Sequence, residues 1–135
     1  MKPEALLASL AGTYSLYNTT NLYNGVAQRS SPSGGILIYT ATGYMSATLG
    51  PSAAGMASVL AYAGPLSVSD TVPSTETSGQ MMHGPMTVAS TASWVGTRQP
   101  RNYTVFRQPD GSVFLRIVTS KTATYESQLW WKKLD

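Results

Sequence analysis

The sequence of 135 residues contains no cysteine and only one histidine, His83. Without cysteine the fold has no disulfide, no thiolate metal site and no cysteine nucleophile. One histidine does not make a conventional metal site unless carboxylates stand at ligand spacing beside it, and the neighbours of His83 are methionine, glycine and proline. We therefore expect no metal and no other cofactor.

Charged residues are also scarce, at 11% of the chain, and the formal net charge is +3. The nine basic residues are scattered from Lys2 to Lys133, and only Lys132 and Lys133 are adjacent. Binding to duplex nucleic acid usually requires several phosphate contacts from one basic face. The sequence therefore predicts no nucleic-acid partner.

Long apolar runs and familiar catalytic motifs are absent as well. No run approaches the roughly 18 apolar residues that a membrane-spanning helix needs. The opening MKPEALLASLAG is broken by Glu4 and is too short for a signal peptide. The chain has no nucleophile elbow, no glycine-rich phosphate loop and no dinucleotide fingerprint. We expect a soluble, cytoplasmic protein without a membrane span, in which any catalysis comes from shaping a reactive substrate and donating a few hydrogen bonds.

Most of the chain is typical of short β-strands. Residues 3–11 suit one helix, with proline and glutamate in its first turn and Gly12 after its end. Gly43 suits the left-handed position of a three-residue hairpin loop, and residues 109–111, Pro-Asp-Gly, form the turn of the clearest hairpin. The strand-bearing segments are residues 12–24, 34–49, 58–70, 79–90, 98–120 and 123–134, of which 34–49 and 98–120 are hairpins.

These segments give eight consecutive antiparallel strands in a single domain that spans residues 1–135. Closing them into a barrel is the most economical arrangement, because closure removes the exposed edges of an open sheet. The predicted fold class is therefore all-β, an eight-stranded antiparallel up-and-down barrel with a short N-terminal helix. Such a barrel has an interior just wide enough for its own side chains or for one small ligand.

Five stretches, spread over nearly the whole chain, are similar to one known family. They are LAGTYSLY, GILIYTATGYMSA, AYAGPLSV, SWVGTRQPRNY and the terminal LWWKKL, and the strongest lie within residues 35–47 and 93–103. In this order they resemble the small lipocalin-like domain proteins of bacteria and filamentous fungi. Three places depart from the family's usual pattern: Tyr14 replaces a tryptophan, Pro100 replaces an aliphatic residue, and either Met82-His83 or Gly84-Pro85 stands at the place of a His-His pair.

The resemblance implies a barrel that binds a small hydrophobic molecule. Fungal relatives resemble members of natural-product pathways, where some lipocalin-like proteins act as cofactor-free cyclases or isomerases, Diels-Alder catalysts included. Fold alone does not assign such a reaction to this chain. The candidate residues therefore have to be weighed individually.

Tyr39 is the first candidate catalytic residue. In the hairpin of residues 34–49, Thr40 pairs with Tyr44 across the loop. Alternation then places five side chains on one apolar face: Leu37, Tyr39, Met45, Ala47 and Leu49. Tyr39 either donates a hydrogen bond to a ligand carbonyl or packs as a core aromatic whose hydroxyl finds a backbone partner.

Arg101 is the second candidate. Strict alternation along the strand places it on one face with Tyr103, Val105 and Arg107. Arg101 either lies in solvent at the rim or points inside the barrel, where it polarises a carbonyl or carboxylate of the substrate. A buried arginine needs a partner, because a buried unpaired charge is very costly. Glu126 and Asp70 are the candidates for that partner.

His83 is the third candidate, as a proton donor or acceptor if it points inward near Tyr39 or Arg101. Alternation places His83 with Met81 and Thr87, on the face opposite to Met82 and Met86. The face with Met82 and Met86 is the more apolar, which favours it as the inner face and turns His83 away from the interior. A bulge at Gly84-Pro85 would reverse this parity.

Several other side chains are expected to contact the ligand. They are Leu37, Met45, Tyr62, Met82, Met86, Trp94, Tyr103 and Trp131. Trp94 either forms a pocket wall or plugs one end of the barrel, whereas Trp131 and Tyr14 are expected to seal the closed end. The methionines are flexible fillers that suit both a core and an adaptable apolar site.

Three functions are compatible with these residues. The leading hypothesis is a cofactor-independent cyclase or isomerase, a Diels-Alder-type pericyclase included, that acts on a hydrophobic polyketide or terpenoid-type intermediate inside the barrel. The second is a carrier that binds a small hydrophobic ligand without turnover. The third is a barrel filled by its own side chains that serves as an interaction partner. The oligomeric state stays open, a homodimer included.

Overall fold

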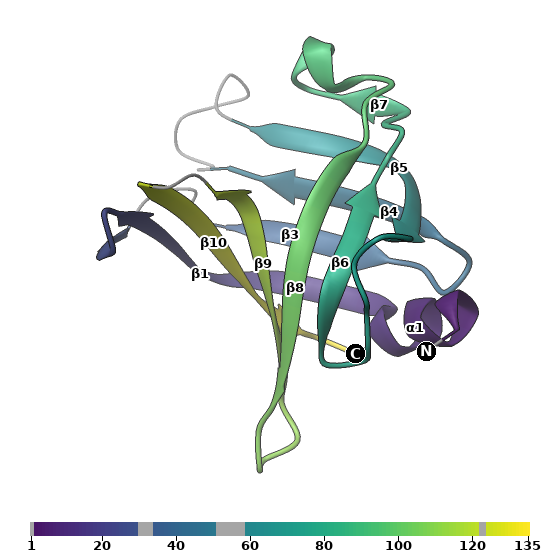
Figure 1. The fold of residues 1–135 in the computed structure, drawn as a ribbon, viewed down its shortest axis with the longest axis horizontal. Coiled ribbons are helices and arrows are strands. Elements are labelled where there is room, and N and C mark those ends of the chain that lie inside the picture. Colours follow the sequence, from purple (N-terminus) through teal and green to yellow (C-terminus); the bar gives the residue numbers. More distant parts are fainter. Residues whose placement is uncertain (1, 30–33, 51–58, 122–123) are drawn as a thin grey trace.

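The computed structural model describes residues 2–29, 34–50, 59–121 and 124–135, and Figure 1 shows its fold. Helix α1 (Pro3–Leu10) comes first, close to the predicted helix over residues 3–11. The strands of the barrel are β1 (Gly12–Tyr23), β3 (Gly35–Tyr39), β4 (Tyr44–Leu49), β5 (Leu60–Val68), β6 (Ser78–His83), β8 (Gln99–Arg107), β9 (Val113–Lys121) and β10 (Tyr125–Lys133). Three short elements are added to them: β2 (Val26–Arg29), β7 (Val88–Ala89) and the 3-10 helix η3 (Ala92–Trp94). Residues 58 and 123, where two predicted strands begin, lie outside the described residues.

The eight barrel strands pair in the order β10-β9-β8-β6-β5-β4-β3-β1, and β10 returns to pair with β1. Every pairing is antiparallel, and the closing pair runs from Tyr14 opposite Lys133 to Tyr23 opposite Tyr125. In Figure 1 the strand β8 crosses in front of β3, β4 and β5, as expected of two sides of one closed sheet. The predicted eight-stranded antiparallel barrel is therefore confirmed.

Side chains alternate between the inner and the outer face along each strand, as the pleat requires. On β4, Met45, Ala47 and Leu49 are buried while Tyr44 and Thr48 are exposed. Burial of apolar surface supplies most of the stabilisation of such a fold, about 25 cal/mol per Å². The inner face predicted for residues 34–49 is the one that the structure buries: Leu37, Tyr39, Met45, Ala47 and Leu49.

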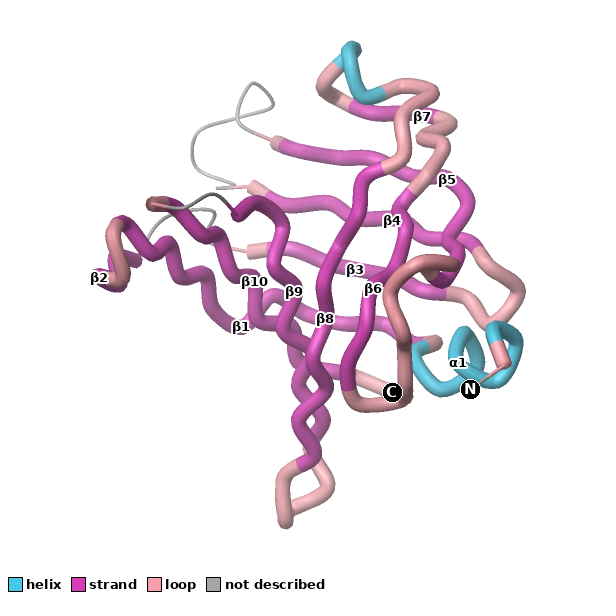
Figure 2. Tube along the Cα trace, in the orientation of Figure 1, coloured by secondary structure: helices cyan, strands magenta, loops and turns pink. Residues whose placement is uncertain are grey.

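Helix α1 covers one end of the barrel, far from the segment that carries β7 and η3 (Figure 2). Its two buried leucines, Leu6 and Leu10, pack into the core. The hydroxyl of Tyr14 on β1 donates a hydrogen bond of 2.6 Å to the carbonyl of Leu10, and the Tyr14 ring meets the Tyr39 ring at 6.1 Å between centroids. The ring of Tyr39 therefore packs against the ring of Tyr14 on the side of the core that faces α1. No helix in the described part of the chain is long and apolar enough to cross a membrane.

The strand predicted over residues 79–90 ends at His83. Gly84 has a φ of +117°, a conformation that favours glycine, and Pro85, joined to it by a cis peptide bond, has no N–H for the ladder. The chain then continues alongside β5, where the amide of Thr87 donates to the carbonyl of Ala63, while the amide of Met86 donates to the carbonyl of Thr97 in the segment before β8. This break changes the parity, so His83 and Met86 are both buried. The expectation that alternation turns His83 away from the interior is wrong for this reason.

Strand β2 was not expected from the sequence. It pairs with the C-terminal part of β1 in antiparallel register, from Thr20 opposite Arg29 to Tyr23 opposite Val26. The turn between them is Asn24-Gly25, and both residues have positive φ, 51° and 81°. Asn-Gly is the residue pair most typical of a two-residue hairpin turn, so the signal was present in the sequence.

Replacing Gly64 with alanine tests how closely the segment after β6 packs on β5. A Cβ at Gly64 would lie 2.8 Å from the carbonyl oxygen of Pro85 and 3.0 Å from the amide nitrogen of Thr87, and backbone atoms cannot move aside cheaply. We expect Gly64→Ala to lower the free energy of unfolding by about 1–3 kcal/mol, measured by denaturant titration.

Gly34→Ala is the matched control, because a Cβ there meets nothing within 4 Å. That variant should change the free energy of unfolding by less than about 0.5 kcal/mol, or raise it slightly by restricting the unfolded chain. If the two variants were equally stable, the segment after β6 would not pack on β5 as described.

Candidate functional site

Two of the three candidate catalytic side chains meet in the interior. The hydroxyl of Tyr39, at the end of β3, lies 2.5 Å from Nε2 of His83, at the end of β6. The exposed fractions of the two side chains are only 3% and 1%. The ring centroids are 5.5 Å apart in an edge-to-face arrangement. The hydroxyl of Tyr39 thus has a side-chain partner, rather than the backbone partner that a purely structural role would lead us to expect.

Burial keeps both members of this pair neutral. Desolvation, followed by the positive charge of Arg101, lowers the pKa of His83 from 6.5 to about 3. Desolvation, with smaller contributions from Tyr62 and Tyr14, raises the pKa of Tyr39 well above its ordinary value of 10.0. A protonated phenol beside a neutral imidazole donates its proton to the imidazole lone pair. Nε2 of His83 is therefore the acceptor, and the proton of the ring lies on Nδ1.

The Nδ1 atom of His83 is buried and has no hydrogen-bond partner among the described residues. Buried polar atoms are nearly always satisfied in folded proteins, by protein, water or a ligand. Leaving such a donor unsatisfied costs about 1–3 kcal/mol. The histidine therefore offers an N–H group for which a bound molecule can supply the acceptor.

Arg101 joins this pair from the neighbouring strand. It lies on β8, opposite Met81 of β6, and its exposed fraction is 4%, so it is an interior arginine and not a solvated one. One terminal nitrogen donates a hydrogen bond of 2.9 Å to the carbonyl of Pro100. The guanidinium carbon lies 5.9 Å from the centre of the Trp94 ring, within the range of a cation–π contact.

Tyr62 of β5 connects these groups. Its ring centroid lies 6.0 Å from that of His83 and 5.4 Å from that of Trp94. Burial raises the pKa of the Tyr62 hydroxyl, while the charge of Arg101 and a side-chain hydrogen bond with it oppose the rise. We call the five side chains that these contacts join the polar cluster: Tyr39, Tyr62, His83, Trp94 and Arg101.

The remaining predicted contact residues lie elsewhere in the barrel. Five of them are buried in the core: Leu37, Met45, Met86, Tyr103 and Trp131. Trp131 has a buried Nε1 without a hydrogen-bond partner in the described part of the chain. The hydroxyl of Tyr103 donates to the carbonyl of Thr75 at 2.5 Å, which is a structural role.

Met82 requires a correction. It pairs with Ser67 and Pro100, between the inward-facing residues Met81 and His83, and so lies on the outer face of β6. Sequence alternation was right to separate Met82 from His83, but it assigned the inner face to the wrong residue. Met82 therefore does not line the interior.

Asp70 and Glu126 are the carboxylates expected to pair with Arg101. Asp70 is exposed in the loop after β5. Glu126 on β10 accepts a hydrogen bond from the side chain of Gln128. A carboxylate partner for Arg101 stays a prediction.

A surface hollow adjoins the polar cluster. It has a volume of about 310 Å³, lies along β4, β5 and β7, and includes Tyr62 and Ala89 in its lining. A second hollow of about 440 Å³ borders Pro3 and the loop of residues 68–75, away from the cluster. Tyr62 thus takes part both in the buried cluster and in a hollow on the surface.

The low pKa of His83 predicts how stability depends on pH. The unfolded chain binds a proton at His83 near pH 6.5, whereas the folded protein does not bind it until about pH 3. The contribution of His83 to the free energy of unfolding is therefore fully present above pH 6.5, and it is lost as the pH falls from 6.5 to about 3. The loss is at most about 1.4 kcal/mol per pH unit. Urea unfolding of the wild type across this range measures it.

The His83→Gln variant provides the comparison, since glutamine does not titrate. Tyr39 and Tyr62 beside His83 have raised pKa values and therefore stay neutral throughout the acid range, and Arg101 is the charged neighbour. The wild type should lose more stability on acidification than the variant. Parallel pH profiles for the two proteins would contradict the buried, neutral state of His83.

Comparison with known proteins supports the interpretation of the fold. Residues 51–134 match the model of a family described as a lipocalin-like domain, which is more than half of the chain. No curated protein and no solved structure matches the chain significantly. The resemblance inferred from the sequence motifs is confirmed, and a lipocalin-like barrel points to the binding of a small hydrophobic ligand. With its closed eight-stranded barrel and this match, the chain belongs to the lipocalin-like domain family.

Proposed function

We propose that the protein is a cofactor-independent cyclase or isomerase that binds one hydrophobic molecule inside the barrel and activates a carbonyl group on it. The observation that carries this proposal is the buried Nδ1 of His83, which has no partner in the described part of the chain although Tyr39 occupies the other ring nitrogen. The substrate class is a polyketide or terpenoid-type intermediate, in keeping with the resemblance described above.

The pKa values favour hydrogen-bond catalysis over proton transfer. With a pKa of about 3, His83 is not an imidazolium at neutral pH, and so it donates a hydrogen bond as a neutral group. Fixed donors inside a site of low polarity stabilise negative charge that develops on an oxygen in the transition state. Arg101 supplies a second donor and a full positive charge.

The aromatic residues of the polar cluster shape the proposed binding site. Tyr62 and Trp94 meet edge to face at 5.4 Å, so their relative positions are fixed by packing. Rigid aromatic walls that hold a flexible substrate in a reactive conformation lower the entropy cost of cyclisation. Such a site accelerates a reaction that the substrate already undergoes slowly, and it needs no nucleophile.

A carrier without turnover is the second candidate. The same pKa shifts favour it, because neither His83 nor Tyr39 exchanges a proton readily near neutral pH. A carrier needs only an apolar interior and one or two donors that orient the ligand. Both candidate functions require ligand binding, so a measurement of turnover distinguishes the enzyme from the carrier.

Deleting the gene and profiling metabolites identifies the substrate. The intermediate that accumulates should be converted by the purified protein faster than it reacts spontaneously, or with a different ratio of products. Conversion at the spontaneous rate and ratio, with the intermediate bound to the protein, would establish a carrier and overturn the enzyme.

Substitutions in the cluster test the proposed donors. His83→Gln and Arg101→Met should each lower kcat about a hundredfold or more, the usual cost of losing one oxyanion donor. Arg116→Met is the matched control, because Arg116 stacks on Phe106 and Trp130 on the outer face of the barrel. Unchanged turnover in both cluster variants would remove His83 and Arg101 from the mechanism.

A further inference from the structure

His83 and Arg101 are neighbours on the inner face of two paired strands. In the register of β6 and β8, His83 lies opposite Gln99 and Met81 lies opposite Arg101. His83 and Arg101 are therefore diagonal neighbours on adjacent strands. The Cα atoms of such a pair lie about 7–8 Å apart, and long side chains can span this distance. Both side chains are almost completely buried.

Both residues present hydrogen-bond donors at this point of the barrel. The guanidinium of Arg101 has five N–H groups and no acceptor. Tyr39 holds Nε2 of His83 as an acceptor, so Nδ1 carries the ring proton and has no partner among the described residues. Arg101 already donates to the carbonyl of Pro100, so a bound group that accepts from both residues adds to its contacts and meets the Nδ1–H of His83.

The charge of Arg101 acts on the whole cluster. It lowers the pKa of His83 and opposes the rise in the pKa of Tyr39 and Tyr62, which stand on three other strands. Electrostatic interactions are stronger in such a buried setting than in water. A guanidinium binds an anion with two oxygens in bidentate fashion, and such charge-assisted bonds are about twice as strong as neutral ones.

We propose that the molecule bound in the barrel carries an anionic oxygen group, a carboxylate or an enolate, held between the Arg101 guanidinium and the Nδ1–H of His83. The inference rests on the proposed function, since it names the chemical class of the ligand of that same site. Tyr39 is a positioning residue, which holds His83 in the tautomer that donates into the interior. Tyr62 and Trp94 contact the apolar body of the ligand.

Two fluorescent probes that differ in one group test this inference. Anilinonaphthalene sulfonate is a hydrophobic anion, and N-phenylnaphthylamine is its neutral counterpart without the sulfonate. Because the sulfonate presents anionic oxygens as a carboxylate does, we expect the wild type to bind the anion at least about tenfold more tightly. Titration of each probe by fluorescence gives both dissociation constants.

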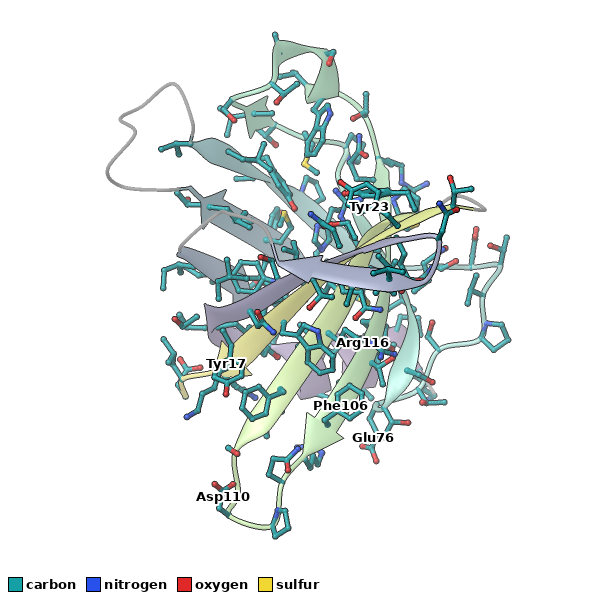
Figure 3. All side chains as sticks on the ribbon, turned by 90° about the vertical axis from the view of Figure 1, so that its left-hand side faces the viewer. Tyr17, Tyr23, Glu76, Phe106, Asp110 and Arg116 are labelled. Carbon is teal, nitrogen blue, oxygen red and sulfur yellow. The ribbon has the colours of Figure 1, made fainter. Side chains whose placement is uncertain are left out.

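Variants test whether Arg101 causes the preference for the anionic probe. Arg101→Met should abolish the preference for the anion while it still binds the neutral probe, which also shows that the variant is folded. Arg101→Lys should keep part of the preference, because the charge remains and the fork of donors is lost. Arg116→Met removes the same charge from the outer face, where Figure 3 shows Arg116 beside Phe106, and should leave the preference intact.

The outcomes separate this inference from the proposed function. Equal affinity of the wild type for the two probes, or the same loss in Arg101→Met and Arg116→Met, would overturn the anion site and leave ligand binding in place. Failure of the wild type to bind either probe would contradict both. If Arg101→Met does not fold, the comparison of the two probes on the wild type and on Arg101→Lys still decides.

Discussion

The candidate site depends on one hydrogen bond that joins β3 to β6 across the interior, between the hydroxyl of Tyr39 and Nε2 of His83. It satisfies two polar groups that would otherwise be costly to bury. It also fixes which ring nitrogen of His83 remains to interact with another molecule. The packing of Tyr14 on one side of Tyr39 and of Tyr62 beside His83 holds both rings in place. Burial keeps His83 neutral, and this bond leaves its Nδ1–H as the group that can meet a ligand.

The break after β6 adds an aromatic residue to this arrangement. Because β6 ends at His83, the chain is irregular at Gly84-Pro85 and then continues alongside β5, where Gly64 leaves room for the backbone of Pro85 and Thr87. This segment continues into η3, which places Trp94 over Arg101. The regular pairing of β6 with β5 thus turns His83 inward, and the irregularity after it brings an aromatic cover over Arg101.

Strand alternation and turn chemistry predicted much of the fold from the sequence. They placed Tyr39 on the inner face of its hairpin and Arg101 on one face with Tyr103, because both strands are regular. Alternation along residues 79–90 assigned the inner face to Met82 and Met86, because it carried one parity through Gly84-Pro85, where the ladder is interrupted, and the Asn-Gly turn before β2 was overlooked. Sequence reasoning gave the contact between Tyr39 and His83 only as a condition, because β4 and β5 separate their strands in the sheet and only the closure of the barrel brings them together.

The tautomer of His83 is the most direct test of the central claim, and the chain makes it simple because His83 is its only histidine. A long-range proton–nitrogen correlation spectrum of the labelled protein at neutral pH shows which ring nitrogen carries the proton. We expect a neutral ring protonated at Nδ1, and a mixture of tautomers in Tyr39→Phe, where the phenol no longer donates to Nε2. An imidazolium in the wild type, or a neutral ring protonated at Nε2, would contradict the account.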